Sequence, residues 1–217
     1  MVPTIRHPLF DPTHPARREA MLEGTGPASQ HVASAEGSDE PPAATVEQVV
    51  LVDDRGEPIG VADKATVHAA RTPRHLAFSC YGFDPAGRLL VTRRADDKST
   101  FPGVWSNTCC GHPAPGESPA DAAIRRLDFE LGLEVTDMRM VLPDFSYRAT
   151  DGRIEENEFC PVLTCIVESE PNPRPDEVGL TQWWSWNRFL EAAADPDSGL
   201  SPWARLQAPL LDAALHR

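Results

Sequence analysis

The stretch GHPAPGESPADAAIRRLDFELGL, residues 111–133, decides the fold because it joins a Gly/Pro-rich turn to a well-delimited helix. Ser118 is a typical N-cap residue, Pro119 suits the first helical position, and Asp121 completes a capping-box pattern. Gly132 favours the left-handed backbone conformation in which helices commonly end. The sequence therefore predicts one helix that begins beside Ser118 and ends at Gly132, entered directly from the turn.

The segments on both sides of this helix predict a mixture of strands and helices. Runs rich in β-branched and aromatic residues, bounded by turn residues, are typical of strands. The turn sequence DPAG, residues 84–87, joins two of them as a hairpin. Hairpins combined with a few helices indicate the α+β class or a mixed-sheet sandwich. The expected strands cover residues 46–54, 75–84, 88–94, 158–168 and 181–186, and the later helices cover residues 187–194 and 201–215.

Residues 1–45 differ from the rest of the chain. They are rich in Pro, Ala, Gly, Ser and Glu and lack a sustained hydrophobic period. We therefore expect a disordered or loosely docked extension, followed by one ordered domain over residues 46–217. Met21 offers an alternative start to Met1, and the sequence does not decide between them.

Composition excludes some classes of function. A net charge of −13 argues against a general nucleic-acid binder, which needs a basic surface. A small anionic substrate stays compatible, because a few clustered cations can outweigh the global charge locally. No apolar run approaches the ~18 residues of a membrane span, and no signal-peptide pattern is present. The five cysteines form no CxxC pair, so we expect a reduced, cytoplasmic protein, working as a monomer without membrane insertion.

The turn and helix resemble the Nudix box, G-x5-E-x7-R-E-U-x-E-E-x-G-U, in which U is aliphatic. The matching residues are Gly111, Glu117, Arg125, Leu127, Glu130, Gly132 and Leu133. Arg126 and Phe129 stand where the box has two glutamates. Those carboxylates normally help to hold the metal ions that activate a hydrolytic water, so the departures count against hydrolysis. Glu117 stays unassigned between a loop cap and a water-mediated metal contact.

A wider resemblance explains the departures. HLAFSCYGFDPAGRLLVTRRADDKSTFPGVWSNTCCGHP (75–113), PDFSYRA (143–149) and ENEFCPV (156–162) follow one another as in type 1 isopentenyl-diphosphate isomerases. The resemblance covers roughly residues 46–207. It implies the Nudix fold, with mixed β-sheets sandwiched by helices. It also implies interconversion of isopentenyl and dimethylallyl diphosphate, an isoprenyl diphosphate substrate and a tertiary carbocation-like intermediate.

The resemblance assigns the proton-transfer roles. Cys110 and Glu158 are the implied pair, and which of them donates the proton stays open. Tyr147 is expected to hydrogen-bond Glu158 and assist the transfer. Trp203 matches an indole beside the carbocation, a cation–π role. Alternation along a strand is expected to aim Glu156 and Glu158 at the same face.

Two metal sites are also implied. The first contains three imidazoles and two carboxylates, a donor set that suits Mn²⁺, Zn²⁺ or Fe²⁺ better than Mg²⁺. The second is a Mg²⁺ site at Glu130, shared with the diphosphate and the Cys110 carbonyl. The first set is His68, His75, His112, Glu156 and Glu158, and the implied diphosphate-binding cations are Lys64, Arg94, Lys98 and Arg126.

Less specific interpretations compete with these. Arg126 and Glu130 have the spacing of an ordinary i,i+4 surface pair, and a lone histidine is usually structural. Cys80, Cys109, Cys160 and Cys165 are expected to be small buried hydrophobes. At the level of function, the alternatives are a Nudix pyrophosphohydrolase of nucleoside or sugar diphosphates and a catalytically silent Nudix-fold binding protein.

Overall fold

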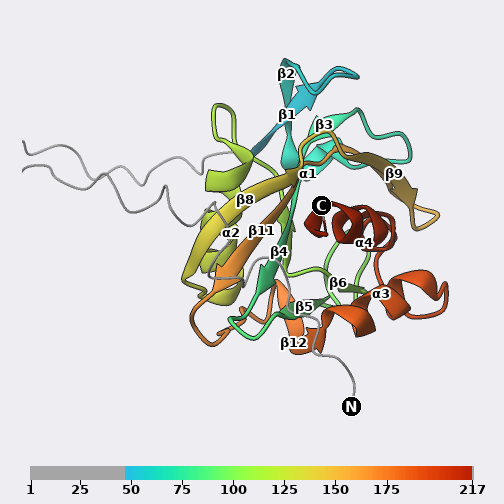
Figure 1. The fold of residues 1–217 in the computed structure, drawn as a ribbon. Coiled ribbons are helices and arrows are strands. Elements are labelled where there is room, and N and C mark those ends of the chain that lie inside the picture. The colour runs from blue at the N-terminus through green and yellow to red at the C-terminus, as the bar shows by residue number, and fades with distance from the viewer. Residues whose placement is uncertain (1–46, 217) are drawn as a thin grey trace, which may run out of the picture.

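The computed structural model of the chain describes residues 47–216. The predicted extension, residues 1–45, lies outside the described residues, so its conformation remains a prediction. The described part contains two β-sheets and four helices, which Figure 1 shows with the β1–β2 hairpin projecting from one end. No helix within these residues is long and apolar enough to span a membrane.

The first sheet has five strands and is mixed. Its order is β2-β1-β3-β10-β9, and β3 pairs with β10 in parallel while the other pairs are antiparallel. Its strands are β1 (Gln48–Val52), β2 (Pro58–Asp63), β3 (His75–Leu76), β9 (Ser146–Thr150) and β10 (Glu155–Phe159).

The second sheet has seven strands, and β11 and β4 at its centre are parallel. The main order is β12-β5-β4-β11-β8, with β6 added to β5 and β7 added to β4. Its strands are β4 (Phe78–Phe83), β5 (Arg88–Arg94), β6 (Trp105–Ser106), β7 (Cys109–Gly111), β8 (Val135–Leu142), β11 (Val162–Val167) and β12 (Val178–Ser185).

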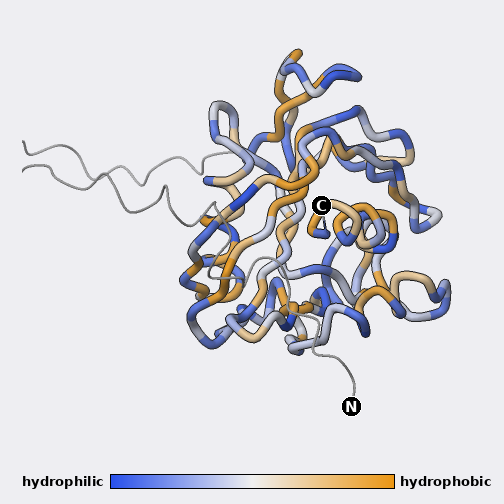
Figure 2. Tube along the Cα trace, viewed as in Figure 1, coloured by the Kyte–Doolittle hydropathy of each residue, from blue (hydrophilic) through white to orange (hydrophobic). Residues whose placement is uncertain are grey.

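Alternation along the central strands creates two apolar clusters, one on each face of the second sheet. Tyr81 and Phe83 belong to the cluster that includes residues of α3 and α4, while Phe78 and Cys80 belong to the cluster that includes residues of α2. Hydrophobic segments run along these central strands in Figure 2. The sheet is thus covered on both faces, by helices α2 (Pro119–Leu131), α3 (Trp186–Ala194) and α4 (Pro202–Leu215); α1 (Lys64–Val67) is a single turn elsewhere.

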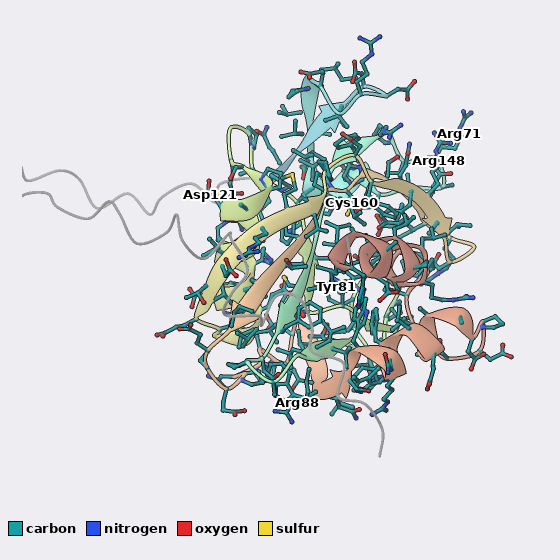
Figure 3. All side chains as sticks on the ribbon, in the orientation of Figure 1. Arg71, Tyr81, Arg88, Asp121, Arg148 and Cys160 are labelled. Carbon is teal, nitrogen blue, oxygen red and sulfur yellow. The ribbon has the colours of Figure 1, made fainter. Side chains whose placement is uncertain are left out.

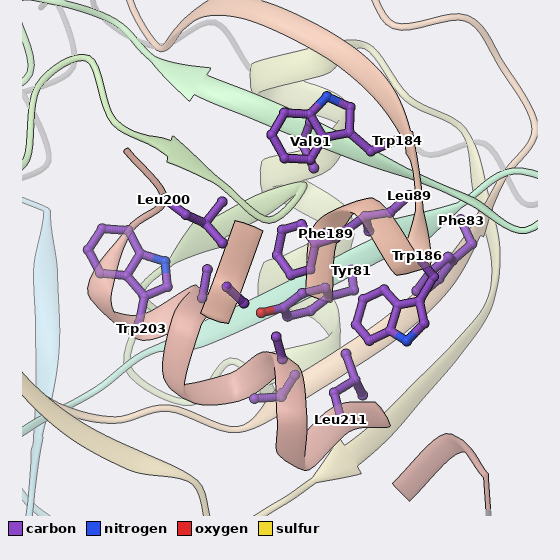
Figure 4. Packing of buried hydrophobic residues seen from close by; sticks show 14 of the residues in the cluster. Tyr81, Phe83, Leu89, Val91, Trp184, Trp186, Phe189, Leu200, Trp203 and Leu211 are labelled. Atoms are coloured by element: carbon purple, nitrogen blue, oxygen red, sulfur yellow. The ribbon is translucent and has the colours of Figure 1, made fainter. Parts of the chain in front are cut away.

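Aromatic packing anchors α3 and α4. Trp186 and Phe189 stack with ring centroids 5.5 Å apart, and Tyr81 meets Phe189 edge-on at 5.8 Å. Figure 4 shows this group at one end of the cluster and Trp203 at the other. In the wider view of Figure 3, Tyr81 and Cys160 lie inside the molecule, and the labelled charged residues lie toward its edge. This packing fixes α3 against the second sheet. On α4, Gln207 Oε1 accepts from the Tyr81 hydroxyl at 2.8 Å, which holds α4 and Trp203 against the same sheet.

The central helix forms as the sequence predicts. Ser118 accepts a hydrogen bond from the backbone N–H of Asp121, and Pro119 occupies the first turn. Gly132 ends α2 with φ of 60°, the left-handed conformation expected of it.

Two expected single strands are each divided between the sheets. The segment from His75 gives β3 in the first sheet and β4 in the second, and the segment from Glu158 gives β10 and β11 in the same way. The prediction of continuous strands was wrong there, because the chain crosses between sheets at Ala77 and at Cys160–Pro161. The two crossings run side by side: the Ala77 N–H donates to the Phe159 carbonyl at 2.9 Å.

Candidate active site

A cavity of about 260 Å³ lies between the two sheets. Its lining comes from strands of both sheets, from α1, α2 and α4, and from the loop after β5. Every residue predicted for the site lines this cavity except His75, which is fully buried behind it. Groups from distant parts of the sequence are therefore gathered in one place.

Three imidazole rings form a cluster at one end of the cavity. His68 follows α1, His75 lies on β3, and His112 follows β7. The ring centroids are 4.9 to 5.4 Å apart, and the Nε2 atoms of His75 and His112 approach to 3.1 Å. His75 Nδ1 lies 3.0 Å from the Pro73 carbonyl, so Nδ1 carries a proton and Nε2 is the nitrogen that faces the cluster.

Two carboxylates of β10 complete this cluster. Glu156 and Glu158 are two residues apart on one strand, and so share a face as expected. Glu158 Oε1 lies 3.3 Å from His112 Nε2 and 3.7 Å from His75 Nε2. Glu156 Oε2 lies 3.2 Å from His68 Nε2. Parallel pairing places Glu158 opposite His75 in register, which fixes their approach through the backbone.

These donors fit a divalent metal ion. Four ligand atoms, one each from His68, His75, His112 and Glu158, all lie within 4.8 Å of one another. His68 Nε2 and Glu156 Oε2 are buried without a hydrogen-bond partner, although they face each other. Buried polar atoms left in this way are costly in a folded protein unless another ligand satisfies them. A site of nitrogen and carboxylate donors that converge on one point is the arrangement a divalent cation needs.

The cluster also sets the charge of its members. Burial opposes the ionisation of Glu158, but hydrogen bonds with His112 and His75 outweigh it and hold the pKa of the carboxyl far below its usual range. Burial lowers the pKa of His112, against the effect of Glu158. Burial also opposes the protonation of His75, but its contacts with Glu158 outweigh burial and raise its pKa. Because both groups bind a metal as carboxylate and deprotonated imidazole, metal binding at this cluster would release the imidazole protons.

The two adjacent cysteines point to opposite sides of β7. Cys109 belongs to the apolar cluster beneath α2, whereas Cys110 packs against the cluster that contains Trp203. Cys110 Sγ donates to Asn107 Oδ1 at 3.2 Å and lies 3.4 Å from Ser79 Oγ. Burial raises the pKa of the Cys110 thiol to about 11, against these two hydrogen bonds, which lower it. The thiol is therefore protonated at neutral pH.

Two aromatic side chains line the cavity near Cys110. Tyr147 is the antiparallel partner of Glu158 across β9 and β10, and its ring centroid lies 6.0 Å from that of Trp203. In the part of the chain that the structure describes, Tyr147 and Glu158 do not form the expected hydrogen bond. They are neighbours because β9 and β10 pair in this register. Trp203 Nε1 donates to Ser106 Oγ at 2.9 Å. The indole is thus held by its edge.

The predicted cations line the rest of the cavity. Lys64 Nζ lies 2.6 Å from Glu47 Oε2, at the start of α1. The Arg94 guanidinium donates to the Thr100 carbonyl at 3.0 and 3.2 Å and lies over the Trp203 ring at 5.9 Å. These contacts hold both cations at the cavity wall.

The other two cations share a carboxylate. Arg126 Nη2 lies 2.6 Å from Glu130 Oε1 and 3.2 Å from Glu177 Oε1. Lys98 Nζ forms a short hydrogen bond with Glu177 Oε2. The i,i+4 pair of Arg126 and Glu130 therefore exists, but it lies in the cavity and is mostly buried, unlike a solvated surface pair.

Sequence comparison identifies the group of proteins. The NUDIX domain family matches residues 73–204. The isopentenyl-diphosphate Delta-isomerase of Mycolicibacterium vanbaalenii is 56% identical over 176 residues, which cover 80% of this chain and 96% of that protein.

The chain belongs to the isopentenyl-diphosphate Delta-isomerase family.

Other members of this family are similarly close. The isopentenyl-diphosphate Delta-isomerase of Saccharopolyspora erythraea is 53% identical, covering 75% of this chain and 84% of that protein. Solved structures share the fold at lower identity. A Deinococcus radiodurans protein superposes with a TM-score of 0.58 at 20% identity, covering 77% of this chain and 99% of that chain. The Nudix fold expected from the sequence, with mixed sheets and few helices, is therefore confirmed.

Glu117, a residue of the Nudix box, stabilises the turn that precedes α2. Its carboxylate accepts from Arg125 at 2.6 and 2.7 Å and from the Ala114 backbone N–H at 2.8 Å, so it braces the turn before α2. Phe129, which replaces a glutamate of the box, is partly exposed, with Arg126 and Arg174 over its ring at 4.9 and 4.3 Å.

Sequence reasoning missed several residues that position this isomerase site. Asn107 accepts from Cys110, and Asn157 donates to the Thr72 carbonyl at 3.0 Å, which ties the loop before His75 to β10. The position of Asn157 between the two glutamates was the available signal for it. Glu177 had no local signal, because its partners are remote in the sequence.

Proposed function

We propose that this chain interconverts isopentenyl and dimethylallyl diphosphate by proton transfer to and from the allylic carbons. One observation carries the proposal: the Cys110 thiol and the Glu158 carboxylate, from different strands, line the same cavity. An allylic shift needs one group that gives a proton to the alkene and a second that removes one from a neighbouring carbon.

The reaction adds one proton to the substrate and removes another. Protonation of the terminal alkene carbon uses the π electrons to form a new C–H bond and leaves a tertiary carbocation. Loss of a proton from the neighbouring methylene returns an electron pair and forms the internal double bond. No oxidant or reductant is consumed. Tyr147, beside Glu158 in the strand register, would assist proton movement there.

The cavity walls suit a cationic intermediate. The rings of Trp203 and Tyr147 are 6.0 Å apart and line the cavity, where their faces would stabilise positive charge. Trp203 is 4% exposed, so this wall also excludes water that would trap the carbocation.

The diphosphate is assigned to the cationic end. Lys64, Arg94, Lys98 and Arg126 line it, and charge-assisted hydrogen bonds from arginine and lysine are the strong contacts for phosphate oxygens. The substitution of Arg126 for a glutamate of the box places a cation where a hydrolase has a carboxylate.

The imidazole–carboxylate cluster would hold Mn²⁺ or Zn²⁺ through three nitrogens and the two carboxylates of β10. Such an ion supplies Lewis acidity, which makes a carboxylic acid bound to it a stronger proton donor. Glu130 and the Cys110 carbonyl offer oxygen donors for Mg²⁺ with the diphosphate; both contacts from Arg126 fall on Glu130 Oε1.

Hydrolysis of a nucleoside or sugar diphosphate is the weaker alternative. Arg126 and Phe129 are committed to an ion pair and to ring stacking, and neither can bind a metal. The free cysteines at 80, 109, 110, 160 and 165 suit a reducing compartment, so we propose a cytoplasmic protein, and we propose that it acts as a monomer.

Proton NMR of isopentenyl diphosphate with purified protein in deuterated water tests the function. Appearance of dimethylallyl diphosphate with deuterium uptake is expected. If the protein instead releases phosphate or a nucleoside monophosphate from a set of diphosphates, without isomerisation, it is a hydrolase.

A further inference from the structure

Glu177 is a carboxylate of the cavity that has no role in the proton chemistry or the metal cluster. Glu177 lies just before β12 and lines the cavity with Lys98 and Arg126. Its Oε2 accepts a short hydrogen bond from Lys98, and its Oε1 lies 3.2 Å from Arg126 Nη2. Arg126 also contacts Glu130, so the four side chains form one row of alternating charge.

The segment that carries Glu177 is fixed by backbone hydrogen bonds. The N–H groups of Asn172 and Arg174 donate to the carbonyls of Leu131 and Glu130, at 2.7 and 2.8 Å, at the end of α2. The Ala95 N–H donates to the Glu177 carbonyl at 3.1 Å, which joins the same segment to the loop of Lys98. The backbone at Glu177 is therefore fixed between α2, which carries Arg126, and the loop after β5, which carries Lys98.

A fixed carboxylate between two cations of an anion site has a cost and a benefit. It adds a negative charge that repels a phosphate group. It also removes the rotamer freedom of two long side chains, which they would otherwise lose when the anion binds. The Glu177 side chain is 16% exposed, and the side chains of Lys98 and Arg126 are 26% and 12% exposed, so these contacts are partly shielded from water.

We infer that Glu177 is a positioning residue that holds Lys98 and Arg126 ready to bind the diphosphate of the substrate. The inference rests on the proposed function, because it takes the substrate anion from it. Glu177 acts through the two cations and touches no reacting atom. Its contribution belongs to binding, so it appears in KM and in the affinity for a diphosphate group, while kcat changes little.

Binding of inorganic diphosphate, measured by calorimetry on the metal-loaded protein, is the direct test. Glu177→Gln keeps the size of the side chain and removes its charge. We expect about tenfold weaker binding, because Lys98 and Arg126 would then lose their rotamer freedom only when the anion binds. The KM for isopentenyl diphosphate should rise by a similar factor, with kcat within about threefold. Glu177→Asp keeps the charge and should recover part of the affinity.

The matched control is Asp176→Asn. Asp176 is the adjacent acidic residue, is exposed, and pairs with Arg174 at 3.1 Å outside the cavity. The Asp176→Asn variant should bind inorganic diphosphate with the affinity of the wild type. A double-mutant cycle adds a second measurement: in a Lys98→Gln background, the effect of Glu177→Gln on affinity should shrink, because the two residues act together.

The outcomes separate the possibilities. Unchanged or tighter diphosphate binding in Glu177→Gln overturns the inference, and tighter binding identifies the carboxylate as a competitor of the ligand. A lower melting temperature with unchanged affinity overturns it in favour of a purely structural role. If Glu177→Gln weakens diphosphate binding but the wild type does not isomerise isopentenyl diphosphate, the inference stands and the proposed function is wrong.

Discussion

At one end of the cavity three imidazoles and two carboxylates face one another across short distances, whereas at the other end each predicted cation already has an acceptor. The first group includes two buried atoms, His68 Nε2 and Glu156 Oε2, without a hydrogen bond. The pairs and acceptors of the second group are Lys64–Glu47, Arg94–Thr100, Lys98–Glu177, Arg126–Glu130 and Arg126–Glu177.

This difference shows how each end of the cavity would bind its ligand, a metal ion at one end and the diphosphate at the other. At the imidazole end, strand register brings donors together, so an ion can satisfy atoms that are otherwise costly to bury. At the cationic end, carboxylates compensate the charges of Lys64, Lys98 and Arg126. Arg94 donates to the Thr100 carbonyl, and an anion must share or exchange these partners. Substitutions should therefore act on metal content and chemistry at one end, and on substrate affinity at the other.

The largest expected effect is at Cys110, next to the imidazole end. Cys110→Ala should reduce turnover of isopentenyl diphosphate by about 10²- to 10⁴-fold, the range for loss of a proton-transfer group. Cys109→Ala is the matched control, because its side chain enters the apolar cluster beneath α2. It should keep its kcat and lose about 1 kcal/mol of unfolding free energy in urea. An inactive Cys109→Ala beside an active Cys110→Ala would reverse the assignment.

Removal of metal should come next in size. A chelator should abolish most turnover and lower the melting temperature, because an ion held at 100 times its dissociation constant stabilises the fold by about 2.7 kcal/mol. In His75→Ala the melting temperature should no longer respond to the chelator, and metal analysis should find less bound ion. Equal responses of the two proteins would show that the ion binds elsewhere.

A smaller effect is expected at the cationic end. Arg126→Gln should raise the KM for isopentenyl diphosphate by roughly tenfold to a hundredfold, as one charge-assisted contact is lost, with a lesser change in kcat. Arg174→Gln removes the other arginine on the Phe129 ring and should leave the KM near the wild-type value. An unchanged KM in Arg126→Gln would reduce that arginine to a structural partner of Glu130.

The smallest effect is expected from the N-terminal segment. A chain that begins at Thr45 should keep kcat/KM within about tenfold of the full-length value, because residues 1–44 contain no periodic apolar pattern that would add to a core. Steady-state kinetics of the two chains make the comparison. A larger loss would mean that the segment takes part in covering the cavity, and the contrast between the two ends would then be incomplete.

The sequence predicted the imidazole end better than the cationic end. Alternation along a strand is a local rule, and it alone placed Glu156 and Glu158 on one face. The three histidines came from the family resemblance, because a lone histidine carries no local signal of a metal ligand. Apart from the i,i+4 pair of Arg126 and Glu130, the carboxylate partners of the cations were not predictable in this way. Glu47 and Glu177 are remote in the sequence from Lys64 and Arg126, and no local pattern announces a long-range ion pair.

The fold shows the same division. Helix α2 followed its capping residues, because caps act within one turn. The crossing at Cys160–Pro161 was missed, because a run of apolar residues looks alike on either side of it; a proline, which lacks a backbone donor, was the local signal. Strands β2, β6, β7, β8 and β9 were also missed. The burial of β8 does not alternate, so its hydrophobic pattern gave no period to recognise.

The paired crossings of the two strand segments have a consequence for the order of folding. His75 meets Glu158 only where β3 lies beside β10, and both segments then continue together as β4 and β11 into the other sheet. Parallel pairing of segments that are remote in the sequence forms late, because the chain loses the entropy of loop closure before the stabilising contacts are made. A partly folded chain therefore lacks the complete ligand set, and tight ion binding would report that the last long-range pairing is in place.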